Sequence, residues 1–125
     1  MLSAGQVSAM RAQMARIMLP DTATIYRPTS EIVGGEQVET WSVLAEDVPC
    51  SLTPFAGEKP GEEGGRIDER STVIIAFPAK QDVRETDRIV VDGVAYNPTH
   101  VRRYGNWEML RRVEARESVE GIPDV

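Results

Sequence analysis

"RIVVDGVAYNP", residues Arg88 to Pro98, is the stretch of sequence that decides the fold. Two apolar runs flank the pair Asp92-Gly93, which tolerates the positive φ angles at both central positions of a type I′ turn. Apolar runs on both sides of such a turn are typical of a β-hairpin. The stretch therefore predicts an antiparallel sheet.

A second hairpin is predicted directly after the first, because "THVRRY" and "WEMLRRVEARE" flank Gly105-Asn106, another pair that accepts left-handed geometry. Upstream, "TATIYRP" predicts a strand that stops at Pro28, and Gly34-Gly35 predicts a turn into "EQVETWSVL". "EDVPCSLTP" follows as a further strand. The continuous apolar run in "STVIIAFP" predicts a strand buried on both sides or in a barrel wall.

The N-terminal segment 3–19 has the apolar spacing of an amphipathic helix, with Ser3 as N-cap and Pro20 after its end. It carries Arg11 and Arg16 and no acid. The apolar stripe either packs on its own subunit or provides a docking face, since flexible Met side chains suit irregular contacts. The candidate docking residues are Val7, Met10, Met14, Ile17 and Met18.

These elements predict one domain over residues 1–125, mainly β, as a small antiparallel β-barrel or sandwich of about six or seven strands. The helix covers 3–19 and the β region 21–117, with a long central loop at 55–71. The last segment, 118–125, loses all periodicity, and we expect it to be a flexible tail.

Composition limits the function classes. Hydrophobic residues make up 41 % of the chain, and no apolar run is long enough for a membrane span or a secretory signal, so we expect a soluble protein without membrane contact. The net charge of −6 argues against a general nucleic-acid coat. Cys50 is the only cysteine, which excludes an intrachain disulfide and favours a packed thiol.

No constellation of residues indicates catalysis. His100 is the only histidine, which leaves too few ligands at suitable spacing for zinc, and no serine lies in a G-x-S-x-G elbow. We therefore expect no catalytic residues, no cofactor and no metal, and His100 is interpreted as an ordinary strand residue before Val101.

The loop "FAGEKPGEEGGRIDERS", residues 55–71, contains four Gly and eight charged side chains and lacks any period that buries a face. Its acids would repel phosphate and no helix follows, so a nucleotide site is not expected. Loops of this length are usually functional or disordered. Its charged residues are Glu58, Lys59, Glu62, Glu63, Arg66, Asp68, Glu69 and Arg70.

"VRRYGNW" combines Arg102 and Arg103 with aromatic residues, as single-strand binding proteins do. Two arginines are few, and on a strand they point to opposite faces. The alternative is that the arginines of this hairpin pair with Glu108 or Glu114, or with other subunits.

The order of these elements resembles the head-closure proteins of long-tailed bacteriophages, also called stoppers or head-tail connector proteins. "TDRIVVDGVAYNPTHV" is similar to that family's signature, which is carried here by a set of five residues. Pro98 departs from the family, which usually has an aliphatic residue there, and this predicts a shortened strand or an edge. The matching residues are Asp87, Ile89, Gly93, Tyr96 and Val101.

The resemblance implies a structural virion protein in the phage neck, made in the host bacterial cytoplasm and assembled as a homo-oligomeric ring of about six or twelve copies. Its implied partners are the adaptor or portal-side connector, the tail tube or tail-terminator protein, and passing double-stranded DNA without sequence-specific binding. The implied role of loop 55–71 is to face or close the DNA exit channel. A flexible segment of about 15 residues reaches about 20 Å, which suits that role.

Two other readings remain open. A tail-terminator or tail-completion protein would be a ring of similar size docked on the end of the tail tube. A small β-barrel that binds a ligand, or an enzyme, would need a concave cluster of polar side chains, and the sequence does not indicate one.

Overall fold

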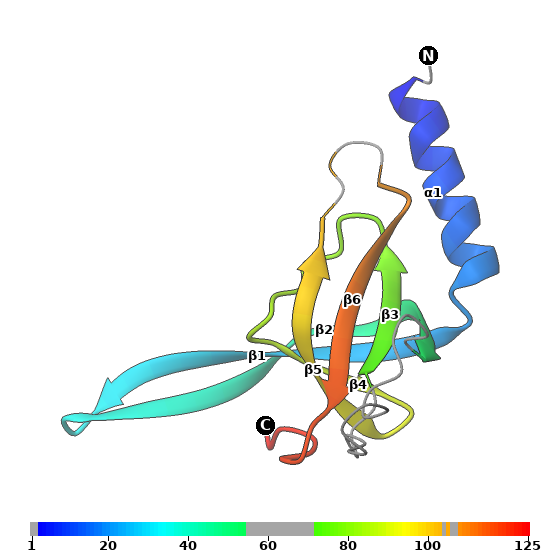
Figure 1. Ribbon diagram of the computed structural model, residues 1–125. Coiled ribbons are helices and arrows are strands. Elements are labelled where there is room, and N and C mark those ends of the chain that lie inside the picture. Colours follow the sequence, from blue (N-terminus) through cyan, green and yellow to red (C-terminus); the bar gives the residue numbers. More distant parts are fainter. Residues whose placement is uncertain (1–2, 55–71, 104, 106–107) are drawn as a thin grey trace, which may run out of the picture.

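The computed structural model describes residues 3–54, 72–103, 105 and 108–125, apart from the side chains of residues 15 and 16. One helix and six strands follow one another (Figure 1). Among the described residues, no helix has both the length and the apolar character needed to span a membrane. The elements are α1 (Ala4–Met18), β1 (Asp21–Val33), β2 (Glu36–Pro54), β3 (Thr72–Pro78), β4 (Arg88–Val91), β5 (Val94–Arg102) and β6 (Leu110–Glu117).

The six strands form one closed antiparallel barrel in the order β1-β2-β3-β6-β5-β4, with β4 pairing back to β1. This confirms the predicted mainly β fold with an N-terminal helix and decides for the barrel over the sandwich. The two segments predicted as separate strands after Gly35 are one strand, β2. The long loop 55–71 lies outside the described residues, and so do Tyr104, Asn106 and Trp107.

The turn of the β4–β5 hairpin has the predicted geometry. Asp92 and Gly93 both have positive φ, 51° and 77°, and Val91 pairs with Val94 across the turn. Gly34 and Gly35 also have positive φ and join β1 to β2. Both turns were identifiable because their residue types are the ones that adopt this backbone without strain.

Replacing Gly93 with alanine is expected to lower the free energy of unfolding by about 1–2 kcal/mol. A Cβ there would meet nothing within 4 Å, so the whole effect comes from the positive φ. The matched control is Gly5→Ala in α1, where φ is ordinary and a stabilisation of up to about 1 kcal/mol is expected. Denaturant titration of both variants measures the difference, and equal effects would contradict the turn argument.

The barrel interior holds the main core. Inward-facing side chains from all six strands meet there. In β3 these are Val73, Ile75 and Phe77, which are every second residue of its apolar run. Ala76 points outward and is buried in a second, smaller cluster with Leu19 and Leu110, on which Met14 of α1 packs. β3 therefore lies in the barrel wall, as one of its two predicted placements held, with its outer face buried at Ala76 and half-buried at Ile74.

Cys50 is fully buried in the barrel core, as expected for a lone packed thiol. Burial raises its pKa from 9.0 to about 12, because the thiolate loses solvation. The folded state therefore retains the thiol proton longer than the unfolded state, and this contribution to stability is fully present below about pH 9. It is lost as the pH rises toward 12.

We expect the unfolding free energy of the wild type to fall more steeply between pH 9 and about 12 than that of Cys50→Ala. Paired denaturant titrations across this range measure the difference, and the variant cancels the contribution of tyrosines and lysines. Parallel curves for the two proteins would contradict the raised pKa.

The prediction that β1 ends at Pro28 is wrong. Pro28 does not end its strand: β1 continues to Val33, and Pro28 lies opposite Trp41 of β2. Proline has no backbone N–H to donate to a neighbouring strand. Its presence is tolerated because β1 pairs with β4 only as far as Tyr26, so the described residues place no strand beside Pro28 on the β4 side. Pro98 in β5 likewise lies past the last pair with β4 and next to a bulge, at an edge as predicted, but β5 continues to Arg102.

Segment 118–125 contacts the barrel. The Ser118 amide donates to the Ala95 carbonyl over 2.8 Å, and the Ser118 side chain is buried. Arg88 on β4 also donates to the Gly121 carbonyl over 3.2 Å. The predicted flexibility of this segment stays a prediction.

Candidate functional site

A long two-stranded arm extends from the barrel and is the most prominent feature of its surface (Figure 1). The arm is residues 28–44, which are the outer halves of β1 and β2 and the turn at Gly34-Gly35. No third strand from the described part of the chain pairs with it, because β4 pairs with β1 only up to Tyr26 and β3 pairs with β2 only at residues 51–54. Residues 29–40 are all exposed.

Two irregularities in the β1–β2 register mark where the arm leaves the barrel. Between Ala23 and Tyr26 the register shifts twice, and each time β2 holds the extra residue. Asp47, within β2, has a φ of 53°. Because bulges bend a strand and increase its twist, they determine the direction in which the arm leaves the barrel wall.

The arm surface is apolar and acidic. It contains three glutamates, Glu31, Glu36 and Glu39, and neither lysine nor arginine. Side chains from both strands expose apolar area, and the Ile32 side chain near the tip is 78 % exposed. Exposed apolar patches with polar neighbours mark interaction sites on soluble proteins. The exposed apolar residues of the arm are Ile32, Val33, Val38, Val43 and Leu44.

An arginine at the base of the arm ties it to the barrel. Arg27 donates to both carboxylate oxygens of Asp87, over 2.9 and 2.8 Å, and to Asp82 over 3.1 and 3.2 Å. Asp87 is fully buried, and it also accepts the Arg84 amide over 2.8 Å. The hydrogen bond from Arg27 holds the pKa of Asp82 below its usual value, and the two carboxylates raise the pKa of Arg27.

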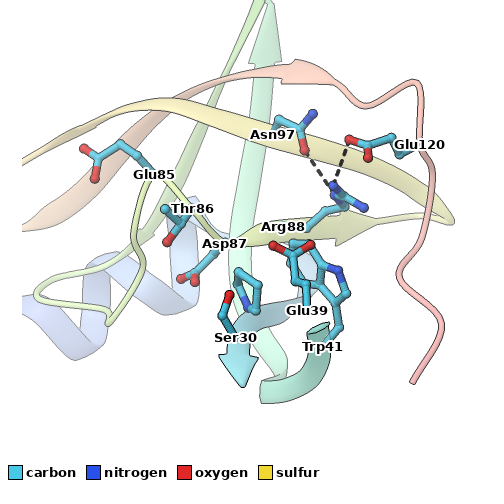
Figure 2. A pocket seen from close by; sticks show the side chains of 10 residues that line it. Ser30, Glu39, Trp41, Glu85, Thr86, Asp87, Arg88, Asn97 and Glu120 are labelled. Carbon is cyan, nitrogen blue, oxygen red and sulfur yellow. Dashed lines mark hydrogen bonds and ion pairs between the residues drawn. The ribbon is translucent and has the colours of Figure 1, made fainter. Parts of the chain in front are cut away.

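A second arginine holds the arm from β4. The guanidinium carbon of Arg88 lies 4.6 Å from the centre of the Trp41 ring, within the range of a cation–π contact. Figure 2 shows the same side chain reaching Asn97 on β5 and Glu120 in the C-terminal segment, over 3.1 and 3.2 Å. Arg88 therefore connects the arm, the barrel and the chain end.

These two anchors enclose an open pocket of about 520 Å³ between the arm and the barrel (Figure 2). Its wall has more carboxylates than cations, and the two buried charged side chains, Asp87 and Arg88, are already engaged in the anchors. Within the described residues, no group of three or more His, Cys, Asp or Glu is placed to hold a metal ion. The pocket is lined by Pro28, Ser30, Glu39, Trp41, Glu85, Thr86, Asp87, Arg88, Asn97 and Glu120.

Helix α1 exposes part of its predicted docking stripe. Ser3 caps the helix with Gln6 in a reciprocal capping box, and the Arg11 side chain donates to the Glu108 carbonyl over 2.7 Å. Val7 and Met14 are half-buried, while Met10, Ile17 and Met18 are exposed by 41, 69 and 48 %. One part of the stripe therefore packs on its own subunit, and the other part is exposed, as a docking face would be.

Three arginines of the β5–β6 hairpin pair with carboxylates of their own chain, in line with the second of the two interpretations given above. Arg102 lies 2.7 Å from Glu114, Arg111 lies 3.3 Å from Glu108, and Arg103 lies 3.7 Å from Glu85. His100 is an exposed strand residue directly before the buried Val101. The proposed stacking partners Tyr104 and Trp107 lie outside the described residues, as do all eight charged residues of the 55–71 loop.

The five signature residues have separate places in the hairpin. Ile89 and Val101 lie in the core, Tyr96 pairs with Ile89 and packs against it, and Gly93 makes the turn. Asp87 is the anchor of the arm. Sequence reasoning missed the arm itself, although the alternation of "EQVETWSVL" after a Gly-Gly turn, with no apolar face, was a signal that both of its faces meet solvent.

No family model matches the chain, and no curated protein matches it either. Among solved structures, the chain is similar to the phage-like element PBSX protein xkdH from Bacillus subtilis. The match has a TM-score of 0.52 at 16 % identity and covers 80 % of this chain and 95 % of that chain. At this identity the likeness establishes a shared fold.

Proposed function

We propose that the protein is a structural phage virion protein that acts in the neck as a head-closure, or stopper, subunit. In this proposal copies form a ring that joins the adaptor or portal side of the capsid to the tail. One observation carries it: the chain shares its fold, over 80 % of its own length and 95 % of the other chain, with a protein of a phage-like element. The sequence resemblance to head-closure proteins supports the same class independently.

The distribution of exposed apolar area supports a role in assembly. The chain presents two separate apolar surfaces, the arm and the outer side of α1, on opposite sides of a closed barrel (Figure 1). A subunit of a ring needs two different surfaces, one for each neighbour, because its contacts are head-to-tail. The pocket at the base of the arm offers little to a ligand, since each of its buried charged groups is already paired, Asp87 with Arg27 and Arg88 with Glu120.

In the proposed ring, residues 55–71 face the DNA channel. Their eight charged side chains include five acids, and acidic groups on a channel wall repel the DNA backbone weakly. Such a wall lets DNA pass without binding it.

The proposal is tested on particles assembled without the protein. If it closes the head, electron microscopy should show filled heads without tails, and these heads should lose DNA on storage. Adding the purified protein back should restore tail joining. Normal tailed particles would contradict the proposal.

The same particles distinguish the tail-terminator alternative. Loss of a terminator would leave the heads closed and would leave tubes of irregular length. Labelling of the protein on intact particles then shows whether it belongs to the head side or to the end of the tube.

A further inference from the structure

The outer part of the arm, residues 29–40, has no packing partner among the residues that the structure describes. Residues 29–40 are exposed on both strands, and the Thr29 and Thr40 side chains bond across the arm, with their hydroxyls 3.0 Å apart. An isolated two-stranded hairpin is only marginally stable in water and needs a third strand or a helix packed on it. The arm is therefore suited to receive a further strand or a helix.

The chain contains an exposed helix that its own arm cannot reach. Figure 1 shows the arm extending from one side of the barrel and α1 running along the other side. The half-buried side of α1 is held by Met14 on the Leu19–Ala76–Leu110 cluster and by the bond from Arg11 to Glu108. Met18 at the end of the same stripe, and Met10 and Ile17 beside it, are exposed.

The arm and α1 carry opposite net charge. The arm has three glutamates and no basic residue, whereas α1 has two arginines and no acid, and Arg11 lies on the side of the helix that packs on the barrel. Opposite net charges on the two elements favour an arm–helix contact over contacts between two arms or between two helices.

We infer that the arm of one copy docks on helix α1 of the next copy. The contact is head-to-tail, because it joins two different surfaces of the same chain, and repeated contacts of this kind close into a ring if the rotation between copies permits. This inference rests on the ring-forming role proposed above and names the surfaces that build the ring.

Disulfide trapping tests the contact directly. Two single variants, Ile32→Cys in the arm and Ile17→Cys in the helix, are mixed at high protein concentration and oxidised mildly. Native Cys50 is buried and unreactive, so the wild type provides the background. Both substituted positions are exposed, and the fold should tolerate the changes.

We expect a heterodimer in at least tenfold higher yield than from the control mixture of Ile32→Cys with Val119→Cys, an equally exposed position in the C-terminal segment. Val33→Cys, which neighbours Ile32 and points to the other face of the arm, repeats the experiment so that either arm face is sampled. Raising the salt concentration should reduce the yield, because salt screens the attraction between elements of opposite net charge.

Equal yields from the test and control mixtures, or no cross-link from either arm position, would overturn the inference. The double variant Ile32→Cys/Ile17→Cys should form a ladder of multimers, and a cross-link within single chains alone would also overturn it. These results can be distinguished from a failure of the proposed function. If particles need the protein but no arm–helix cross-link forms, only the inferred contact is refuted. If the cross-linked ring forms but particles assemble normally without the protein, only the proposed role in head closure is refuted.

Discussion

Replacing Asp87 with alanine is expected to lower the free energy of unfolding by about 3–5 kcal/mol. The change removes both hydrogen bonds from Arg27 and the bond from the Arg84 amide, and it leaves the Arg27 guanidinium, only 16 % exposed, with one solvent-facing partner. Urea titration followed by circular dichroism measures the loss, provided that unfolding stays two-state.

The matched control is Asp82→Ala, which removes the other carboxylate of the same arginine. The Asp82 side chain is 63 % exposed, so its ion pair is screened by water and its loss is expected to cost less than about 1 kcal/mol. Similar losses for the two variants would show that burial of Asp87 is not what makes the anchor strong.

Because Arg27 lies at the base of the arm, the two variants should also differ in how well the arm is held. Asp87→Ala should speed hydrogen exchange at arm amides more than at the amides of β5 and β6. Uniform acceleration over the whole barrel would mean that Asp87 supports global stability without a specific role at the arm.

Replacing Ile75 with alanine is expected to destabilise the protein by about 2–5 kcal/mol. Ile75 lies in β3, has no exposed surface and packs in the barrel core, so truncation removes apolar contacts and leaves a cavity. Thermal or denaturant unfolding measures the loss.

Ile32→Ala is the same truncation made in the arm. Ile32 is 78 % exposed, and a change of less than about 0.5 kcal/mol is expected for the monomer. A large loss from Ile32→Ala would show that the arm packs on its own chain. If the arm docks on a second copy, the variant should instead weaken self-association while leaving monomer stability unchanged.

Much of the fold was predictable because its signals are local. Asp92-Gly93 and Gly34-Gly35 have the residue types that their positive φ angles require, and both turns lie where expected. Ser3 caps the helix as predicted, because its hydroxyl accepts the amide of a residue three positions on. The apolar run of β3 indicated a strand buried on both sides or in a barrel wall, since such a run has no polar alternation.

The local signal was misleading at Pro28. Proline removes one donor, and from sequence this indicates the end of a strand. Whether the donor is needed depends on the neighbouring strand, and β4 is too short to reach this position. The arm was missed for this reason.

The sequence by itself determined the mainly β class, the positions of the tight turns, the amphipathic helix and the buried thiol, because each depends on residues close together in the chain. Only the tertiary structure decided that the sheet closes through β1 and β4, that the outer halves of β1 and β2 stand alone, and that Arg27 meets an aspartate 60 residues away. Closure depends on bulges and strand lengths acting together, and a buried ion pair depends on which loop folds over which strand. Neither is encoded in the period of any single segment.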